Sequence, residues 1–313
     1  MNSALAPIVL FVYNRPLHTR KTLEALAAND LADKSKLIIF SDGPKQNASE
    51  EQVKQIEEVR QIVHSIHWCN EVCIIESDYN KGLADSIING VTEVVNHYGK
   101  VIVLEDDLVL SSGFLKFMNR ALTIYENEKK VMHISGYSYP LFRKGKNKIY
   151  FLKHVGSWGW ATWADRWQCF ENDAGLILQK LGNVKVQASD FNSGFGKDFA
   201  TQLILNVKGL ANTWAIKWHS SVYLENGLTL FPKLSLVRNV GFDGGGTHMN
   251  ILNAVLAGQK MDTENNFMFT KPYFSKVAYR KLQFYYFTNV SLNKKRIKLI
   301  NKLKKTTSFN QAL

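Results

Sequence analysis

Cysteine is scarce in this chain of 313 residues, and long apolar runs are missing. The three cysteines, Cys69, Cys73 and Cys169, are too few for a disulfide framework, which favours a reducing compartment. No apolar run approaches the roughly 20 residues that a membrane-spanning helix needs, and no basic residue precedes the first apolar stretch, which argues against a signal peptide. We therefore expect a protein on the cytoplasmic side of the membrane.

Internal repeats, low-complexity segments and two common catalytic loops are also absent. The sequence has neither a Gly-x-Ser-x-Gly motif nor a Walker-type loop, so nothing in it indicates a serine hydrolase or a P-loop protein. It does have an ordinary globular composition, with 45% hydrophobic and 21% charged residues. This composition excludes disordered, collagenous and coiled-coil proteins.

Acidic residues are missing from the last part of the chain. The last one is Glu264, and eleven basic residues follow it. These eleven carry almost all of the net charge of +12, which leaves about +1 for residues 1–264 and no basic surface there that favours nucleic acid. We expect one folded domain over 1–264, with a first half at 1–107 and a second at 108–264, followed by a basic aromatic segment at 265–313.

Apolar runs and amphipathic segments alternate along the first half. The apolar runs show no polar alternation, so the sequence predicts an α/β fold whose mostly parallel sheet has helices on both faces. The second half lacks this pattern and is predicted to be loop-rich, with helical segments near 173–181 and 197–208. Strands are predicted at 6–13, 36–40, 72–75 and 101–104, and helices at 17–28, 49–66, 82–98 and 112–127.

Three carboxylates, those of Glu105, Asp106 and Asp107, follow the fourth predicted strand. Ligands of parallel sheets bind beyond the carboxyl ends of the strands, where Arg15 and Asp42 also fall. Clustered like charges beside a core are costly unless a cation offsets them, and carboxylate oxygens suit Mg²⁺ or Mn²⁺ held against substrate phosphates. The sequence favours a metal site here over the alternative, a solvated acidic turn.

The order of these motifs resembles that of glycosyltransferases with the GT-A fold. Strand–Asn-Arg, strand–Ser-Asp-Gly, the helix start Asn80-Lys-Gly-Leu83 and the segment Glu105-Asp-Asp-Leu108 look most like the N-acetylglucosaminyltransferase I family and its bacterial family 2-like relatives. The likeness covers roughly residues 6–250 and is strong over 6–136.

This resemblance implies a GT-A catalytic domain over 1–264, with a Rossmann-like half that binds the nucleotide sugar and a second half that binds the acceptor. It implies that Asp107 binds Mn²⁺ (or Mg²⁺) and that Glu105 and Asp106 lie near the ribose and the donor sugar. Family enzymes of this type invert the anomeric centre.

Three further residues have both a binding and a structural interpretation. The resemblance puts Asp42 and Arg15 in the nucleotide pocket, where Asp42 would accept the N3–H of uracil and Arg15 would contact base or phosphate. Asp42-Gly-Pro is also an ordinary turn. Lys81 precedes a helix beside the donor, and a solvated lysine is an equally good interpretation.

A direct displacement needs a base for the acceptor hydroxyl. The related family has an aspartate before a helix in the second half, and Asp198 is the best match to it. Asp190 and Asp173 are rivals, and Asp243 is a weaker one. An aspartate at a helix start is also a common N-cap.

Two later segments extend the resemblance. Ser157-Trp-Gly-Trp160 resembles a Gly-Trp segment that lines the donor and acceptor pocket, which puts Trp160 in the predicted site, while part of the tryptophan cluster is expected in the core. The glycine-rich segment 241–248 resembles a loop that ends in a histidine near the phosphates. The family's own residues are missing around His248, so its role stays open.

These observations predict a metal-dependent, inverting glycosyltransferase. It would move a sugar from a nucleotide-diphosphate donor, a UDP-sugar, to a hydroxyl of a glycan or lipid-linked glycan, as in the synthesis of bacterial surface polysaccharides or glycoconjugates. One alternative is a sugar-nucleotide nucleotidyltransferase; Asn14-Arg-Pro-Leu17 counts against it, because such enzymes carry a Gly- and Lys/Arg-rich loop there. The other is a non-enzymatic binder of glycan or nucleic acid, which only the basic tail supports.

The basic segment also has two interpretations. Within 294–305, Ile297, Ile300 and Leu303 fall near one helical face among lysines, which is typical of a helix that lies on an anionic bilayer. We expect 288–313 to tether the protein to the inner face of the cytoplasmic membrane. In the alternative, 267–287 packs on the catalytic body and only the last residues form a solvated tail.

Overall fold

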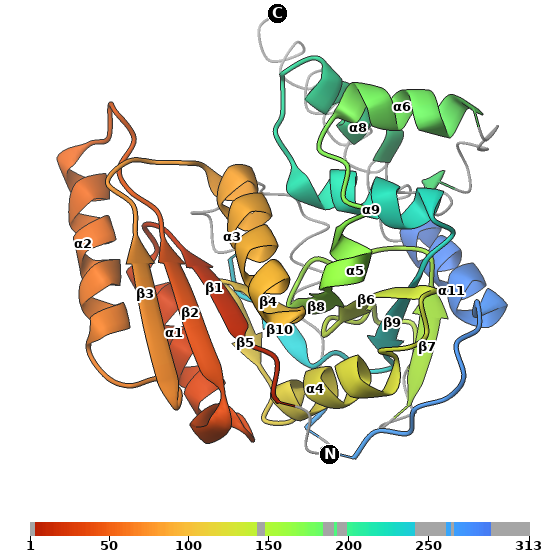
Figure 1. Ribbon diagram of the computed structural model, residues 1–313, viewed down its shortest axis with the longest axis horizontal. Helices are drawn as coiled ribbons and strands as arrows, with labels where there is room; N and C mark the ends of the chain where they lie inside the picture. Colours follow the sequence, from red (N-terminus) through yellow and green to blue (C-terminus); the bar gives the residue numbers. More distant parts are fainter. Residues whose placement is uncertain are drawn as a thin grey trace, which may run out of the picture.

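The computed structural model describes residues 4–142, 148–183, 191–192, 199–241, 261–263 and 266–288. Figure 1 shows a large sheet with helices on both faces, an α/β architecture as predicted. The strands are β1 (Ile8–Val12), β2 (Lys36–Ser41), β3 (Glu71–Glu76), β4 (Lys100–Glu105), β5 (Leu108–Leu110), β6 (Val131–Ser135), β7 (Ile149–Leu152), β8 (Trp160–Trp163), β9 (Leu228–Pro232) and β10 (Val237–Asn239). The helices are α1 (Pro16–Ala27), the 3₁₀ helix η1 (Ala32–Lys34), α2 (Glu50–His64), α3 (Leu83–Tyr98), α4 (Phe114–Ile124), α5 (Ala164–Trp167), α6 (Ala174–Asn183), α8 (Phe199–Val207), α9 (Trp214–Leu224) and α11 (Lys276–Tyr286).

The strands and helices predicted for the first half are confirmed, and their ends have local causes. Every residue of β1 is buried. Pro16 is the first residue of α1, a position whose backbone N–H has no partner within the helix, so the N–H that proline lacks is not needed there. A capping box of Ser49 and Gln52 begins α2. Gly82, just before α3, has φ +80°, a backbone angle that residues other than glycine rarely adopt.

The large sheet has the strand order β3-β2-β1-β4-β8-β6-β9-β7. β2 and β4 flank β1 and are both parallel to it, so a topological switch point lies between β1 and β4. β8 and β7 run antiparallel to their neighbours. The carboxyl ends of β1, β2, β3, β4, β6 and β9 therefore meet at one side of the sheet, which we call the carboxyl edge.

The second half continues this sheet, where the sequence predicted mostly loops. β6, β7, β8 and β9 are only four or five residues long, and long connections separate them. Short runs that do not alternate regularly with helices carry too little pattern to be identified as strands. The helices α6 and α8 do fall where helical segments were predicted, and α9 is an additional helix.

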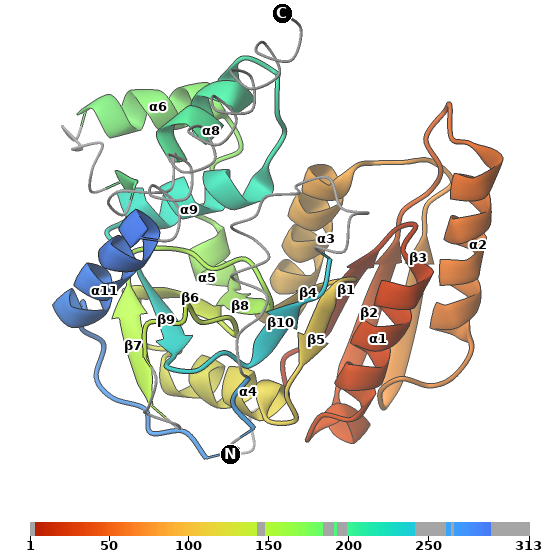
Figure 2. The ribbon, with the colours of Figure 1, turned by 180° about the vertical axis from the view of Figure 1, so that it is seen from behind.

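Two hydrophobic layers cover the two faces of the sheet. α1, α2 and α4 contribute to one layer, and α3, α5 and α9 contribute to the other. Figure 1 looks at the face with α3 and α5, and Figure 2 looks at the face with α1. The central strands are buried on both faces, as their continuous apolar runs require, whereas the edge strand β3 leaves Glu71, Cys73 and Glu76 exposed.

Part of the C-terminal segment packs on the same body. Phe267 is 3% exposed, and its ring centroid lies 4.8 Å from that of Phe117. The Tyr125 hydroxyl donates a hydrogen bond of 2.7 Å to the Thr270 carbonyl, and α11 contacts the edge strand β7. These contacts agree with the interpretation in which 267–287 belongs to the body. Among the described residues, no helix has the length and apolar character to cross a membrane.

A neutral histidine lies in the core between β6 and α9. His133 is fully buried, and burial lowers its pKa to about 3. Its Nδ1 accepts a hydrogen bond of 3.0 Å from the Trp218 indole N–H, and its Nε2 donates one of 2.9 Å to the Gly156 carbonyl. Because Nδ1 must be unprotonated to accept, this arrangement requires the neutral imidazole.

We expect His133→Leu to lower the free energy of unfolding by about 3 kcal/mol, because it leaves the Trp218 N–H and the Gly156 carbonyl buried without partners. His133→Gln can form hydrogen bonds with both partners and should lose less.

The pKa of this histidine is about 6.5 when unfolded and about 3 when folded. Below pH 6.5 the wild type therefore loses up to about 1.4 kcal/mol per pH unit through this residue. Urea unfolding at pH 7 and pH 5 measures this loss of stability in the wild type. If His133→Gln, which has no imidazole to protonate, lost as much stability between the two pH values, His133 would not be the cause.

Candidate active site

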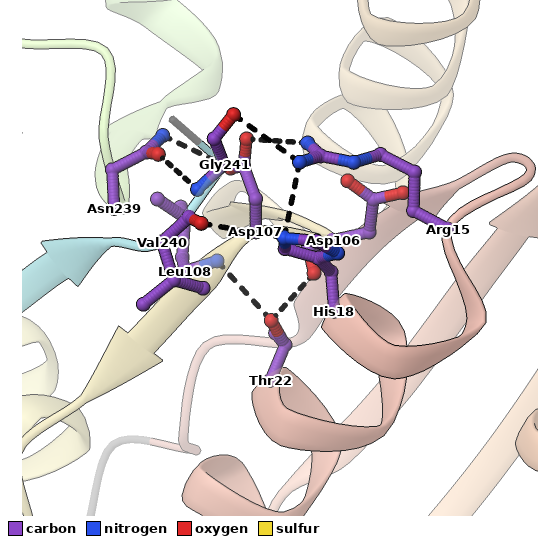
Figure 3. A network of polar contacts seen from close by, with 9 residues as sticks. All are labelled: Arg15, His18, Thr22, Asp106, Asp107, Leu108, Asn239, Val240 and Gly241. Atoms are coloured by element: carbon purple, nitrogen blue, oxygen red, sulfur yellow. Dashed lines mark hydrogen bonds and ion pairs between the residues drawn. The ribbon is translucent and has the colours of Figure 1, made fainter. Parts of the chain in front are cut away.

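Arg15 and Asp107 meet at the carboxyl edge. Arg15 follows β1, and Asp107 follows β4, the neighbouring strand. The Arg15 Nη1 lies 3.0 Å from the Oδ2 of Asp107, as Figure 3 shows. Because the two strands flank the topological switch point, this ion pair stands where open α/β sheets bind ligands. Both residues belong to the predicted site, and the fold brings them together.

A segment from far along the chain also contacts Asp107. β10 pairs with β5, the strand that follows the three carboxylates. The Nδ2 of Asn239 donates a hydrogen bond of 3.0 Å to the Oδ1 of Asp107. The Val240 N–H donates to the Asp107 carbonyl over 2.9 Å, and the Arg15 Nη2 donates to the Gly241 carbonyl over 3.3 Å. Both halves of the chain therefore hold Asp107 in place.

Gly241 leaves no room for a side chain at this point. A Cβ there would lie 2.2 Å from the Oδ2 of Asp107 and 2.8 Å from the Nη1 of Arg15. The glycine is thus a steric requirement of the ion pair. Sequence reasoning singled out the glycine run that begins here but did not connect Asn239 or Gly241 with Asp107, because no local pattern marks a contact between such distant residues.

Helix α1 supplies two further contacts that the sequence did not indicate. The Thr22 hydroxyl donates to the Asp106 carbonyl over 2.8 Å and accepts from the Leu108 N–H over 3.1 Å. The Nε2 of His18 lies 3.1 Å from the Nη2 of Arg15. These contacts fix the turn between β4 and β5 and one side of the arginine (Figure 3).

The three carboxylates repel one another in a partly buried place. Burial raises the pKa of Glu105 well above its usual range, that of Asp106 to about 7, and that of Asp107. The charge of neighbouring carboxylates adds to the shifts of Glu105 and Asp106, while Arg15 lowers the pKa of Asp106 and Asp107. A cation beside the carboxylates would stabilise their charged forms. The electrostatics therefore favour a positively charged partner.

Carboxylate oxygens are the ligands that Mg²⁺ and Mn²⁺ prefer. Within the part of the chain that the structure describes, no three His, Cys, Asp or Glu side chains converge so as to hold a metal ion. The Asp107 side chain is 19% exposed and already accepts hydrogen bonds from Arg15 and Asn239. The residues thus fit an ion that takes one or two carboxylates and completes its shell with ligand phosphates and water. They do not form a ready-made cage.

Asp42 lies at the carboxyl edge, after β2, but its carboxylate oxygens already accept hydrogen bonds from the protein itself. Its Oδ1 accepts from the backbone N–H of Gly43 (3.0 Å) and Lys81 (2.8 Å). Its Oδ2 accepts from the Nδ2 of Asn80 (2.9 Å) and the N–H of Gly82 (3.0 Å). Four hydrogen bonds fill the lone-pair sites of a carboxylate. Asp42 therefore holds the loop before α3, in line with the turn interpretation, and the Lys81 side chain is exposed beside it.

Trp160 is a core residue, which corrects its predicted place in the donor pocket. It has 0% exposure and stacks between His133 and Trp214, at centroid distances of 5.1 and 5.2 Å. A ring without exposed surface has no face left for a sugar. Trp158, two residues earlier, is partly exposed. Because β8 is antiparallel to β4, Trp158 falls at the carboxyl edge.

Several predicted residues lie outside the residues that the structure describes: Asp190, Asp198, Asp243 and His248, and the segment 289–313. Asp173, the remaining rival for the base, is described. Its Oδ1 accepts the N–H of Gly175 at 2.8 Å and of Leu176 at 3.1 Å, at the start of α6. Asp173 therefore caps this helix.

No protein-family model matches the chain, and no curated protein matches it in sequence. Several solved structures resemble it. Residues 1–349 of S. aureus TarS are 9% identical at a TM-score of 0.39, and the match covers 74% of this chain and 59% of that one. LgtC, a galactosyltransferase solved with donor and acceptor sugar analogues, is 8% identical at a TM-score of 0.38 over 84% of each chain. Mouse xyloside xylosyltransferase 1 is 10% identical at a TM-score of 0.35, over 70% of this chain and 81% of that one.

This chain spans about three fifths of the TarS structure that it matches. LgtC and the mouse protein are glycosyltransferases by name. At identities of 10% or less and TM-scores below 0.4, these likenesses carry no conclusion about activity. What this chain does must therefore be inferred from its own residues.

Proposed function

We propose that the chain is a glycosyltransferase that moves a sugar from a nucleotide-diphosphate donor, a UDP-sugar, to a hydroxyl of a glycan. The observation that carries this proposal is the ion pair of Arg15 with Asp107, the last of three adjacent acidic residues, at the switch point between β1 and β4. A guanidinium suits phosphate oxygens. Partly buried carboxylates suit a divalent ion that also binds phosphates. A nucleoside diphosphate satisfies both requirements.

In this proposal each residue has a defined task. Arg15 pairs with diphosphate oxygens, and Asp107 binds Mn²⁺ (or Mg²⁺), with Glu105 and Asp106 near the ribose and the donor sugar. When bound, the ion supplies Lewis-acid neutralisation of the departing diphosphate. Asp198 takes the proton of the acceptor hydroxyl, whose direct attack inverts the anomeric centre.

The finer proposals concern donor contacts, acceptor and location. Trp158, whose partly exposed ring packs against Tyr137, replaces Trp160 as an aromatic residue for the donor sugar at the carboxyl edge. Lys81 lies beside the donor, and His248 lies near its phosphates. The acceptor is a glycan or lipid-linked glycan of bacterial surface polysaccharide or glycoconjugate synthesis. The support for a lipid-linked acceptor is the basic, aromatic sequence after residue 264, with 288–313 as the tether.

The deciding experiment measures the products formed from UDP-glucose, UDP-galactose and their N-acetylamino forms, with Mn²⁺ and with EDTA. Release of UDP that requires Mn²⁺ is the expected result. Conversion of a UDP-sugar and added pyrophosphate to UTP and sugar 1-phosphate would instead identify a nucleotidyltransferase. A chain that binds a glycan or nucleic acid and turns over no donor would be a non-enzymatic binder.

We expect Gly241→Ala to weaken the binding of UDP with Mn²⁺ roughly tenfold, because the added Cβ displaces the Asp107 carboxylate and Arg15. Isothermal titration of UDP in the presence of Mn²⁺ measures this. Gly182→Ala is the matched control, since a Cβ at Gly182 meets nothing within 4 Å. Equal affinities in the two variants would show that the ion pair does not contribute to the nucleotide site.

A further inference from the structure

Helix α11 has two very different faces. Ala278, Leu282 and Tyr286 point inward and have 0% exposure, and they join a cluster that includes residues of β7 and β9. The outward face consists of side chains that are all exposed, and half of them are basic while half are apolar. These are Lys276, Val277, Arg280, Lys281 and Phe284 of the helix, together with Phe287, the residue that caps its C-terminal end.

The apolar half of this outward face is unusual for a helix in water. Phe284 is 69% exposed, Val277 is 62% exposed and Phe287 is 46% exposed. A helix that packs on a globular body by one face normally presents polar side chains on the other. Contiguous exposed apolar side chains mark an interaction surface. No acidic residue occurs anywhere in 266–288, so the surface carries positive charge only.

The positive charge continues from α11 onto the sheet. The Nζ of Lys281 lies 4.8 Å from the centroid of the Phe142 ring, and the Nζ of Lys233 lies 4.9 Å from the same centroid. Burial, Lys148 and Lys281 together lower the pKa of Lys233. Among the described residues, no acidic side chain forms an ion pair with any of these three lysines. The fold thus gathers like charges that a negatively charged partner would relieve.

We propose that the outward face of α11, together with Lys148 and Lys233, is a docking surface for an anionic phospholipid bilayer. Basic side chains attract anionic head groups, and aromatic side chains insert at the boundary between head groups and acyl chains. A nucleic acid would account for the lysines and Arg280 but not for the exposed Val277 and Phe284. Only an anionic apolar surface satisfies both halves of the face.

The docking surface has a definite place relative to the candidate active site. Figures 1 and 2 show α11 beside β7, at the end of the sheet away from α2. Lys233 follows β9, and Lys148 precedes the antiparallel β7, so both stand at the carboxyl edge. If the chain transfers sugars as proposed, docking brings the edge with Arg15 and Asp107 close to lipid-borne acceptors. The docking itself does not depend on that activity.

The test is cosedimentation of the full chain with vesicles of phosphatidylcholine, alone or with about one third phosphatidylglycerol, at low and high salt. We expect binding only to the anionic vesicles, and weaker binding at high salt. The double variant Phe284→Ser/Phe287→Ser should bind at least roughly tenfold more weakly. Arg280→Gln/Lys281→Gln should lose roughly fivefold for each charge removed.

Matched controls change the same chemistry elsewhere on the surface. Ile66→Ser/Leu210→Ser alters apolar side chains that are 56% and 72% exposed, and Lys21→Gln/Lys54→Gln removes two exposed charges. Both controls should bind like wild type, and circular dichroism checks that every variant folds. Equal binding of the Phe284→Ser/Phe287→Ser variant and its control would overturn the proposal. So would tighter binding to a duplex oligonucleotide than to vesicles. Vesicle binding by a chain that turns over no UDP-sugar would refute the proposed function alone.

Discussion

Asp107→Ala is expected to abolish Mn²⁺-dependent binding of UDP and to lower sugar transfer by on the order of 10³-fold. The carboxylate that would hold the ion is replaced by a methyl group, so the diphosphate charge loses its main counterpart. Arg15 also loses the ion pair that orients it at 3.0 Å. Titration of UDP with and without Mn²⁺, and transfer rates at saturating donor, measure the two effects.

Two companion variants separate charge from folding. Asp107→Asn keeps the shape and the acceptor for the Asn239 amide but lacks the charge, so it should fold and still fail to bind the ion. Asp33→Ala removes an exposed carboxylate in η1, remote from the site in sequence and fold, and should behave like wild type. Near-normal turnover in a folded Asp107→Ala variant would show that Asp107 is not the metal ligand.

Asp198→Asn is expected to keep UDP affinity and to lower transfer by about 10²–10⁴-fold, the usual cost of losing a general base. The amide is nearly isosteric but takes up no proton. Asp198 immediately precedes α8, and the first residue of that helix, Phe199, is only 6% exposed and belongs to a buried cluster. The backbone that follows Asp198 is therefore anchored by the core.

Single-turnover transfer together with UDP titration separates chemistry from donor binding. Asp173→Asn is the reference variant, because Asp173 caps α6 and should affect stability more than transfer. If Asp198→Asn transfers within a few-fold of wild type while Asp190→Asn is inactive, Asp190 is the base instead.

The first half of the fold was predictable because its signals are local. Each of β1–β4 contains an unbroken apolar stretch, these stretches alternate with helices, and two of the helices have clear start signals, Pro16 at α1 and the capping box of Ser49 at α2. The meeting of Arg15 with Asp107 follows from one further rule, that parallel strands end at the same edge. No distant contact had to be guessed for this half of the site.

The other features of the fold and the site depend on contacts between distant residues, which no local sequence pattern indicates. Trp158 and Trp160 look alike in the sequence, yet only Trp160 is a β8 residue sealed between His133 and Trp214. Asn239 has no motif, and its role exists only because β10 pairs with β5. The basic aromatic segment was recognised from composition, but the division of α11 into a buried and an exposed face needed the packing on β7.

The pairing of β10 with β5 has a consequence for the making of the protein. The hydrogen bond from Asn239 to Asp107 joins residues 132 positions apart, and that from Arg15 to Gly241 spans 226. Contacts across such separations form late, because closing a long loop costs chain entropy before any contact offsets it. Until residues 239–241 are made, a nascent chain therefore lacks the contacts that these residues give to Asp107 and Arg15. The ion pair between Arg15 and Asp107 gains its full set of contacts only after residue 241 has been synthesised.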